Sequence, residues 1–160
     1  MSQESPITKS GLDKIKLELD HLIKVERESL KKIIQEAREL GDLKENAEYH
    51  AAKEKQSQLE GRIMQLQGAV ASSRVVNIAD VKTDKIVFGA TVTLLDVDKD
   101  TKVKYQIVGE FESSSEQGKI SYTSPLGKAL IGKEEGDTVI VKAPKGDIEY
   151  EVESVEYIDS

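Results

Sequence analysis

The chain has 160 residues, a formal net charge of −7 and no cysteine. This length suits one ordinary domain or two small ones, and the absence of cysteine excludes disulfide scaffolds and thiolate metal sites. No run approaches the roughly 18 apolar residues of a membrane span, and the N-terminus lacks the basic-then-apolar layout of a signal peptide. We therefore expect a cytoplasmic protein that does not associate with membranes.

The negative charge lies mainly in the second half of the chain. Residues 1–80 contain 13 Lys/Arg and 14 Asp/Glu, whereas residues 81–160 contain 10 and 16. A free-standing nucleic-acid-binding protein should present a dominant basic face. The sequence therefore predicts weak binding to naked nucleic acid, and any such contact should be local or arranged by a protein partner.

A helical pattern extends over residues 12–40 and resumes after residue 46. Apolar residues recur at spacings of three and four, in narrow seams with polar flanks that are typical of a two-stranded coiled coil. Glu26 falls in a seam position, so the first stripe is imperfect midway. Thr8 or Ser10 is the expected cap of the first helix. The expected seam residues are Leu12, Ile15, Leu19, Leu22, Leu30, Ile33, Ala37 and Leu40, then Ala47, Ala51, Leu59, Ile63, Leu66 and Val70.

A period of two replaces the helical pattern in the second half. Runs rich in Val, Ile, Thr and Tyr predict strands at 87–96, 102–108, 119–123, 137–142 and 148–155. Pro125 indicates the first turn of a short helix between the third and fourth of these strands.

The predicted fold class is therefore α+β. An N-terminal antiparallel α-helical coiled-coil hairpin (residues 1–77) reverses at an acidic tip (41–46). A linker (78–83) leads to a small, mainly antiparallel-sheet domain (84–160).

The tip contains two carboxylates, and their spacing has two interpretations. Asp42 and Glu45 have the spacing of a capping box, in which Asp42 caps the second helix and Glu45 reaches back, while Gly41 ends the first helix. Alternatively, the two carboxylates share one face of a divalent cation. They are too few to hold Mg²⁺ alone, but they could complete a site whose other ligands come from a partner and from phosphate. Spacing alone favours the cap, because caps are far commoner than catalytic pairs.

The sequence ARELGDLKENAEYHAA at residues 37–52 resembles the tip of the bacterial Gre transcript cleavage factors, of the GreA type. The likeness continues through the chain in order, over residues 6–158. It includes Thr8-x-x-Gly11 near the start, FGATV at 88–92, IVG at 107–109, SPL at 124–126 and LIGKEEGD at 130–137.

This resemblance implies a globular domain of FKBP-like fold that docks at the rim of the secondary channel of bacterial RNA polymerase, on the largest catalytic subunit. The hairpin then reaches the active centre. There Asp42 and Glu45 help to hold a weakly bound second Mg²⁺, which the free protein does not bind tightly, and position the attacking water. The polymerase itself cleaves the backtracked nascent RNA, so arrested complexes are rescued. The protein is expected to be a monomeric accessory factor and not an autonomous nuclease.

Other residues have weaker claims to a role. Arg38, Lys44 and Lys53 could neutralise phosphates at the 3′ end of nascent RNA, or they form ordinary surface pairs. A Pro-bounded loop between strands suits a contact surface, so the expected polymerase-docking residues are Ser124, Pro125 and Leu126.

Three alternatives stay open. A relative that occupies the same channel could inhibit the polymerase, although the tip sequence DLKEN (42–46) matches the cleavage-active pattern. An FKBP-like fold could carry prolyl isomerase activity, since fold alone does not give function, but the domain has no Trp and only scattered aromatic residues. The hairpin could also be a plain coiled-coil interaction module.

Overall fold

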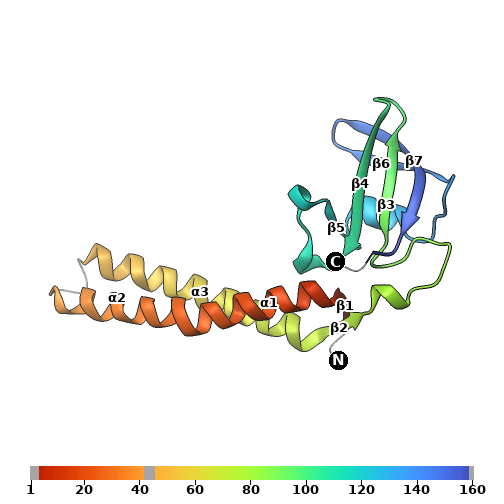
Figure 1. Cartoon of the computed structure of the whole chain (residues 1–160). Coiled ribbons are helices and arrows are strands. Elements are labelled where there is room, and N and C mark those ends of the chain that lie inside the picture. The colour runs from red at the N-terminus through yellow and green to blue at the C-terminus, as the bar shows by residue number, and fades with distance from the viewer. Residues whose placement is uncertain (1–3, 42–45, 159–160) are drawn as a thin grey trace. The chain divides into compact units, whose positions relative to one another are not determined.

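The computed structural model describes residues 4–41 and 46–158 (Figure 1). By contacts the chain divides into two compact units, Asp13–Ser72 and a globular unit of Met1–Leu12 with Ser73–Ser160. The first unit contains most of a helical hairpin, and the second contains the sheets. This arrangement confirms the α+β fold with an N-terminal hairpin. In the described part of the chain, no helix is long and apolar enough to cross a membrane.

The hairpin consists of α1 (Lys9–His21), a π-helical turn η1 (Leu22–Glu26), α2 (Arg27–Glu39) and α3 (Ala47–Ser72). Figure 1 shows α2 and α3 side by side. On α3 the residues that face the seam are spaced by three, four or seven, as in a coiled coil. They are Tyr49, Ala52, Leu59, Ile63 and Leu66, which are buried or half-buried.

The predicted placement in the seam is wrong for four residues. Ile33 and Leu40 are 49% and 69% exposed, and Ala47 and Ala51 are exposed too. The neighbouring Ile34 and Ala52 are buried instead, at 7% and 3%. On α3 the half-buried Tyr49 belongs to the seam, whereas Ala47 and Ala51 do not.

On the first arm, the π-turn η1 changes the phase of the seam, so that Ile34 is buried in place of Ile33. A π-turn closes i→i+5 hydrogen bonds, so it takes one residue more than an α-helical turn. His21 Nε2 consequently lies 3.3 Å from Glu26 Oε1, five residues on. The extra residue leaves Glu26 exposed and brings Arg27 to the seam. Glu26, which interrupts the apolar stripe in the sequence, therefore lies in the turn where the helix changes phase.

Arg27 is partnered across the seam. Its Nε and Nη2 donate to the two carboxylate oxygens of Glu60 at 2.9 and 2.8 Å, and its side chain is 29% exposed. A bidentate pair of this kind fixes geometry as well as adding energy. Arg27 and Glu60 therefore hold α2 and α3 in one register directly after the π-turn.

The globular unit contains a five-stranded sheet in the order β5-β4-β3-β7-β6. All its neighbours are antiparallel except β4 and β5, which are parallel. The bounds are β3 Thr91–Asp96, β4 Thr101–Val108, β5 Lys119–Ser121, β6 Thr138–Ala143 and β7 Gly146–Glu156. The helix α4 (Pro125–Leu130) and short 3₁₀ turns η2 (Ile78–Asp80), η3 (Glu110–Glu112) and η4 (Ser115–Gln117) complete the unit.

The core of this unit lies on one face of the sheet. Its buried residues are Ile86, Ala90, Val92, Leu94, Ile107, Leu130, Val139 and Val152. The strand predicted at 87–96 is β3, which begins at Thr91 and not at residue 87, because Gly89 has a left-handed φ of +92°. The Tyr157 hydroxyl secures the preceding loop, since it donates to the Lys85 carbonyl at 2.6 Å and accepts the Val87 N–H at 3.1 Å. Burial raises the pKa of Tyr157 above its ordinary value.

Two short strands were not predicted. β1 (Ser5–Thr8) and β2 (Ser73–Val76) pair in parallel, with Ser5 opposite Ser73. Four residues beside a long helix carry too little period-two pattern to be recognised. These strands group both ends of the hairpin sequence with the sheet domain, so the division by contacts differs from the sequence boundaries at residues 77 and 84.

Glu112 anchors the start of α1 within the globular unit. Its carboxylate accepts the N–H groups of Thr8 at 3.1 Å and Gly109 at 2.8 Å, and also the Thr8 hydroxyl. Thr8 Oγ1 in turn accepts the Gly11 N–H at 3.0 Å, which confirms Thr8 as the cap. A Cβ at Gly11 would overlap the Glu112 carboxylate. The Thr8-x-x-Gly11 motif therefore provides a cap and a close approach to Glu112.

The π-turn predicts unequal effects of two single-residue deletions. Deleting Val25, which is 52% exposed, removes the extra residue, and the same seam then continues in a regular α-helix. We expect an unfolding midpoint within about 2 °C of wild type, or higher. Deleting the exposed Gln58 from the uninterrupted α3 displaces the buried Ile63 and Leu66, which should destabilise the hairpin by about 3 kcal/mol or more and lower the midpoint by more than about 10 °C. Thermal unfolding followed by far-ultraviolet circular dichroism tests this, and equal losses would contradict the phase shift.

The anchor predicts a selective loss at Glu112. Glu112→Ala leaves the Thr8 and Gly109 N–H groups without their acceptor, so we expect a loss of about 1–3 kcal/mol. Glu116→Ala changes an exposed carboxylate in the neighbouring 3₁₀ turn and serves as the control. Urea unfolding measures both, and similar stabilities for the two variants would refute the anchor.

Candidate functional site

The candidate site is the tip of the hairpin, between α2 and α3. The described residues end at Gly41 on one side and begin at Asn46 on the other. Asp42, Lys44 and Glu45 lie outside the described residues, so the roles assigned to them stay predictions. The structure describes the frame that holds both ends of this segment.

The first side of the frame is the end of α2. The Leu40 N–H donates to the Ala37 carbonyl at 3.2 Å, which tightens the last turn. Gly41 follows with a φ of +122°, a left-handed conformation that favours glycine. The prediction that Gly41 ends the first helix is confirmed.

The second side of the frame is the start of α3, and its N-cap is Asn46. The Asn46 Oδ1 accepts the Tyr49 N–H at 3.1 Å, while its carbonyl accepts the His50 N–H at 3.1 Å. An N-cap is the residue directly before the first helical residue, which here is Ala47. Asn46 therefore occupies the N-cap position of α3, and Asp42, the cap expected from the sequence, lies outside the described residues.

Asn46 also reaches the other helix. Its Nδ2 donates to the Ala37 carbonyl at 2.5 Å, so one side-chain amide bonds the last turn of α2 and the first turn of α3. Both polar atoms of the amide are used. We call the set of Ala37, Asn46 and Tyr49 the tip clamp.

Packing supports the clamp from within the hairpin. Tyr49 is half-buried against a cluster of Leu30, Ile34 and Ala52, so it belongs to the seam and is not a surface residue. The Arg38 guanidinium lies 5.9 Å from the centre of its ring, within the range of a cation–π contact. The aromatic ring thereby ties α3 to both the core and the exposed side of α2.

The basic candidates are placed on the exposed surface of this frame. Arg38 is exposed and contacts the Tyr49 ring, and Lys53 is exposed and donates to the Gln56 Oε1 at 3.0 Å. Contact of Arg38 and Lys53 with RNA stays a prediction. Among residues 4–41 and 46–158, no group of three or more His, Asp and Glu side chains is arranged to hold a metal ion.

The docking candidates lie at the start of α4. The Ser124 Oγ accepts the Gly127 N–H at 3.1 Å and donates to the Ser121 carbonyl at 2.7 Å. Leu126 is partly buried against the sheet core. Ser124 and Leu126 therefore have structural roles, while Pro125 is the exposed member of the three.

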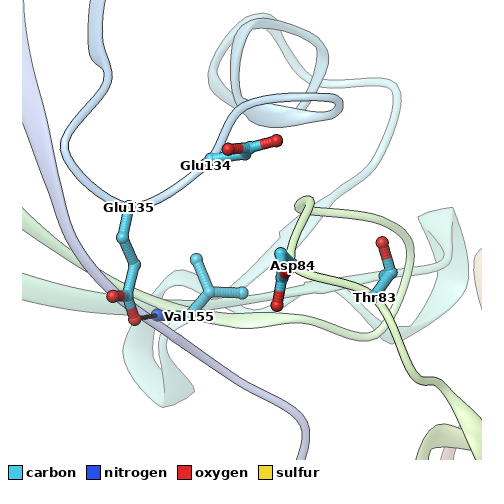
Figure 2. Close-up of a pocket in the computed structure, with 5 residues that line it drawn as sticks. All are labelled: Thr83, Asp84, Glu134, Glu135 and Val155. Atoms are coloured by element: carbon cyan, nitrogen blue, oxygen red, sulfur yellow. Dashed lines mark hydrogen bonds between the residues drawn. The ribbon is translucent and has the colours of Figure 1, made fainter.

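A cavity of about 290 Å³ lies elsewhere in the globular unit, and Figure 2 shows its lining. Its walls are Thr83, Asp84, Glu134, Glu135 and Val155, and the Glu135 Oε1 accepts the Val155 N–H at 3.2 Å. Pockets for small organic ligands are mostly apolar and aromatic, whereas this lining is largely acidic and has no aromatic residue. The cavity gives no support to the prolyl isomerase alternative.

Comparison with known proteins assigns both halves of the chain to one class of factor. The family described as "Transcription elongation factor, N-terminal" matches residues 5–75, and "Transcription elongation factor, GreA/GreB, C-term" matches residues 81–157. The chain belongs to the GreA/GreB family of transcription elongation factors. The resemblance found in the sequence is confirmed.

Individual relatives agree with this assignment. Transcription elongation factor GreA from Anaeromyxobacter sp. (strain K) is 53% identical over 157 residues, which cover 98% of this chain and 95% of the relative. The protein of the same name from Xylella fastidiosa (strain 9a5c) is 51% identical over 155 residues, 96% of this chain and 98% of the relative. The solved structure of GreA factor homolog 1 (Gfh1) from Thermus thermophilus is 27% identical, covers 96% of this chain and 99% of that chain, and has a TM-score of 0.45. The family assignment therefore rests on the family matches and the sequence identities, and not on this structural similarity.

Proposed function

We propose that this protein binds the secondary channel of RNA polymerase and stimulates the polymerase's own Mg²⁺-dependent cleavage of backtracked nascent RNA. The observation that carries the proposal is the cap at Asn46, because it provides the start of α3 with a cap other than Asp42. With α3 capped by an amide, Asp42 is not needed to start the helix. The proposal also draws on membership of the GreA/GreB family.

The proposed role of Asp42 and Glu45 follows from their chemistry. Two carboxylates are too few ligands for Mg²⁺, which prefers octahedral oxygen coordination. They would therefore act only as part of a site shared with the polymerase and the RNA, and the protein would be an accessory factor. Bound there, Mg²⁺ would orient the attacking water and lower its pKa.

The proposed partner is the largest catalytic subunit of RNA polymerase, at the rim of the channel, with the factor acting as a cytoplasmic monomer. The exposed Pro125 and its neighbours Ser124 and Leu126 are the proposed docking contacts. Arg38, Lys44 and Lys53 are the proposed contacts to the 3′ end of the nascent RNA. Of these three, Arg38 is held in place by the Tyr49 ring.

The alternative within the same fold is a factor that occupies the channel and inhibits the polymerase. The relatives that are 51–53% identical to this chain carry the name of an elongation factor, and this favours stimulation. Incubation with a stalled, backtracked polymerase complex separates the two functions, since an inhibitor would slow extension and leave the backtracked RNA uncut.

The acidic pair predicts a loss of cleavage without a loss of binding. With a stalled, backtracked bacterial polymerase complex and Mg²⁺, the wild-type protein should shorten the labelled RNA. Asp42→Asn and Glu45→Gln should each reduce this rate on the order of 100-fold or more, because a metal ligand contributes several kcal/mol to the transition state.

The matched control is Glu48→Gln, a change at an exposed carboxylate in the first turn of α3, which should retain near wild-type cleavage. The Asp42 and Glu45 variants should still compete with wild type for the polymerase. Undiminished cleavage by both variants would refute the role of the pair.

A further inference from the structure

We infer that Asn46 is a positioning residue for the acidic pair, acting through the tip clamp and not by touching the metal or the RNA. This inference rests on the proposed function. It starts from the use of both ends of one side chain, since the Asn46 oxygen accepts from Tyr49 and its nitrogen donates to Ala37. An ordinary N-cap needs the first bond alone.

The two bonds require an amide at this position. Aspartate and serine can accept the Tyr49 N–H, but an ionised carboxylate has no hydrogen to donate. The serine hydroxyl has one donor on a shorter side chain, so it cannot replace an amide that bridges two helix ends. The requirement at residue 46 is therefore narrower than that of an ordinary N-cap, for which aspartate and serine are as good as asparagine.

The anchor points of the clamp are firmly held. Ala37 is 3% exposed, and its carbonyl accepts from both Asn46 and the Leu40 N–H at 3.2 Å. Tyr49 packs on the seam and under the Arg38 guanidinium. The clamp consequently joins the last turn of α2 to the first turn of α3, the two helix ends that flank residues 42–45 in the sequence.

A fixed frame matters because the proposed site is assembled from two molecules. The carboxylates must meet a cation that the polymerase and the RNA also hold, and each freedom lost on docking costs free energy. Small misplacements of a reacting group can reduce a rate about 100-fold. The clamp should therefore affect the catalytic rate and the Mg²⁺ requirement more than binding to polymerase.

The test compares Asn46→Asp and Asn46→Ser with wild type in the stalled-complex assay. Both variants keep the cap and lose the bond to Ala37, while only the first adds a charge. We expect the maximal cleavage rate to fall about 10- to 100-fold in both, with a higher Mg²⁺ concentration at half-maximal rate. The protein concentration at half-maximal effect and the helical content should stay close to wild type.

Asn77→Asp is the matched control, because Asn77 is also an N-cap, accepting from Ala79 at 3.2 Å, but it lies in the globular unit. It should cleave like wild type. If Asn46→Asp and Asn46→Ser match wild type in rate and Mg²⁺ dependence, Asn46 is only a cap and the inference is overturned alone. If wild type itself leaves the RNA uncut, the proposed function fails and the inference with it.

Discussion

The hairpin depends on the register of the apolar seam between α2 and α3. Ile63 and Leu66 are fully buried on α3, and Leu30 and Ile34 meet the seam from α2. A regular α-helix through Glu26 would place the wrong residues in contact, so one extra residue in the π-turn sets the phase of everything beyond it. Arg27 then fixes that phase through its two bonds to Glu60.

Correct register is what makes the tip clamp possible. Small side chains let helices approach closely, and the buried Ala37 and Ala52 lie near the end of the seam. There Asn46 reaches the Ala37 carbonyl while it caps α3. Functional groups are commonly presented by loops on rigid scaffolds. In this chain the scaffold is a helix pair closed by one amide, and the segment with the proposed metal ligands lies between its ends.

Much of this architecture could be predicted from the sequence, because periodicity and turn chemistry are local. The hairpin, the main strands, the Thr8 cap and the left-handed Gly41 follow from such signals. The cap at Asn46 was missed because Asp42 and Glu45 match a known local pattern, and the bond to Ala37 joins residues nine apart in sequence. The anchor at Glu112 was also hidden, since it joins residues 104 apart. Neither contact leaves a periodic trace in the sequence.

The central claim is that Asp42 supplies an oxygen ligand to a metal ion shared with RNA polymerase. The chain has no cysteine, so Asp42→Cys introduces a single thiolate, a soft ligand that favours thiophilic metals over Mg²⁺. The direct measurement is RNA cleavage in the stalled complex by Asp42→Cys and Asp42→Ala, in Mg²⁺ alone and with added Cd²⁺. The account predicts that both variants are inactive in Mg²⁺ and that Cd²⁺ restores cleavage to the cysteine variant only. Equal behaviour of the two variants with Cd²⁺ would contradict metal ligation at residue 42.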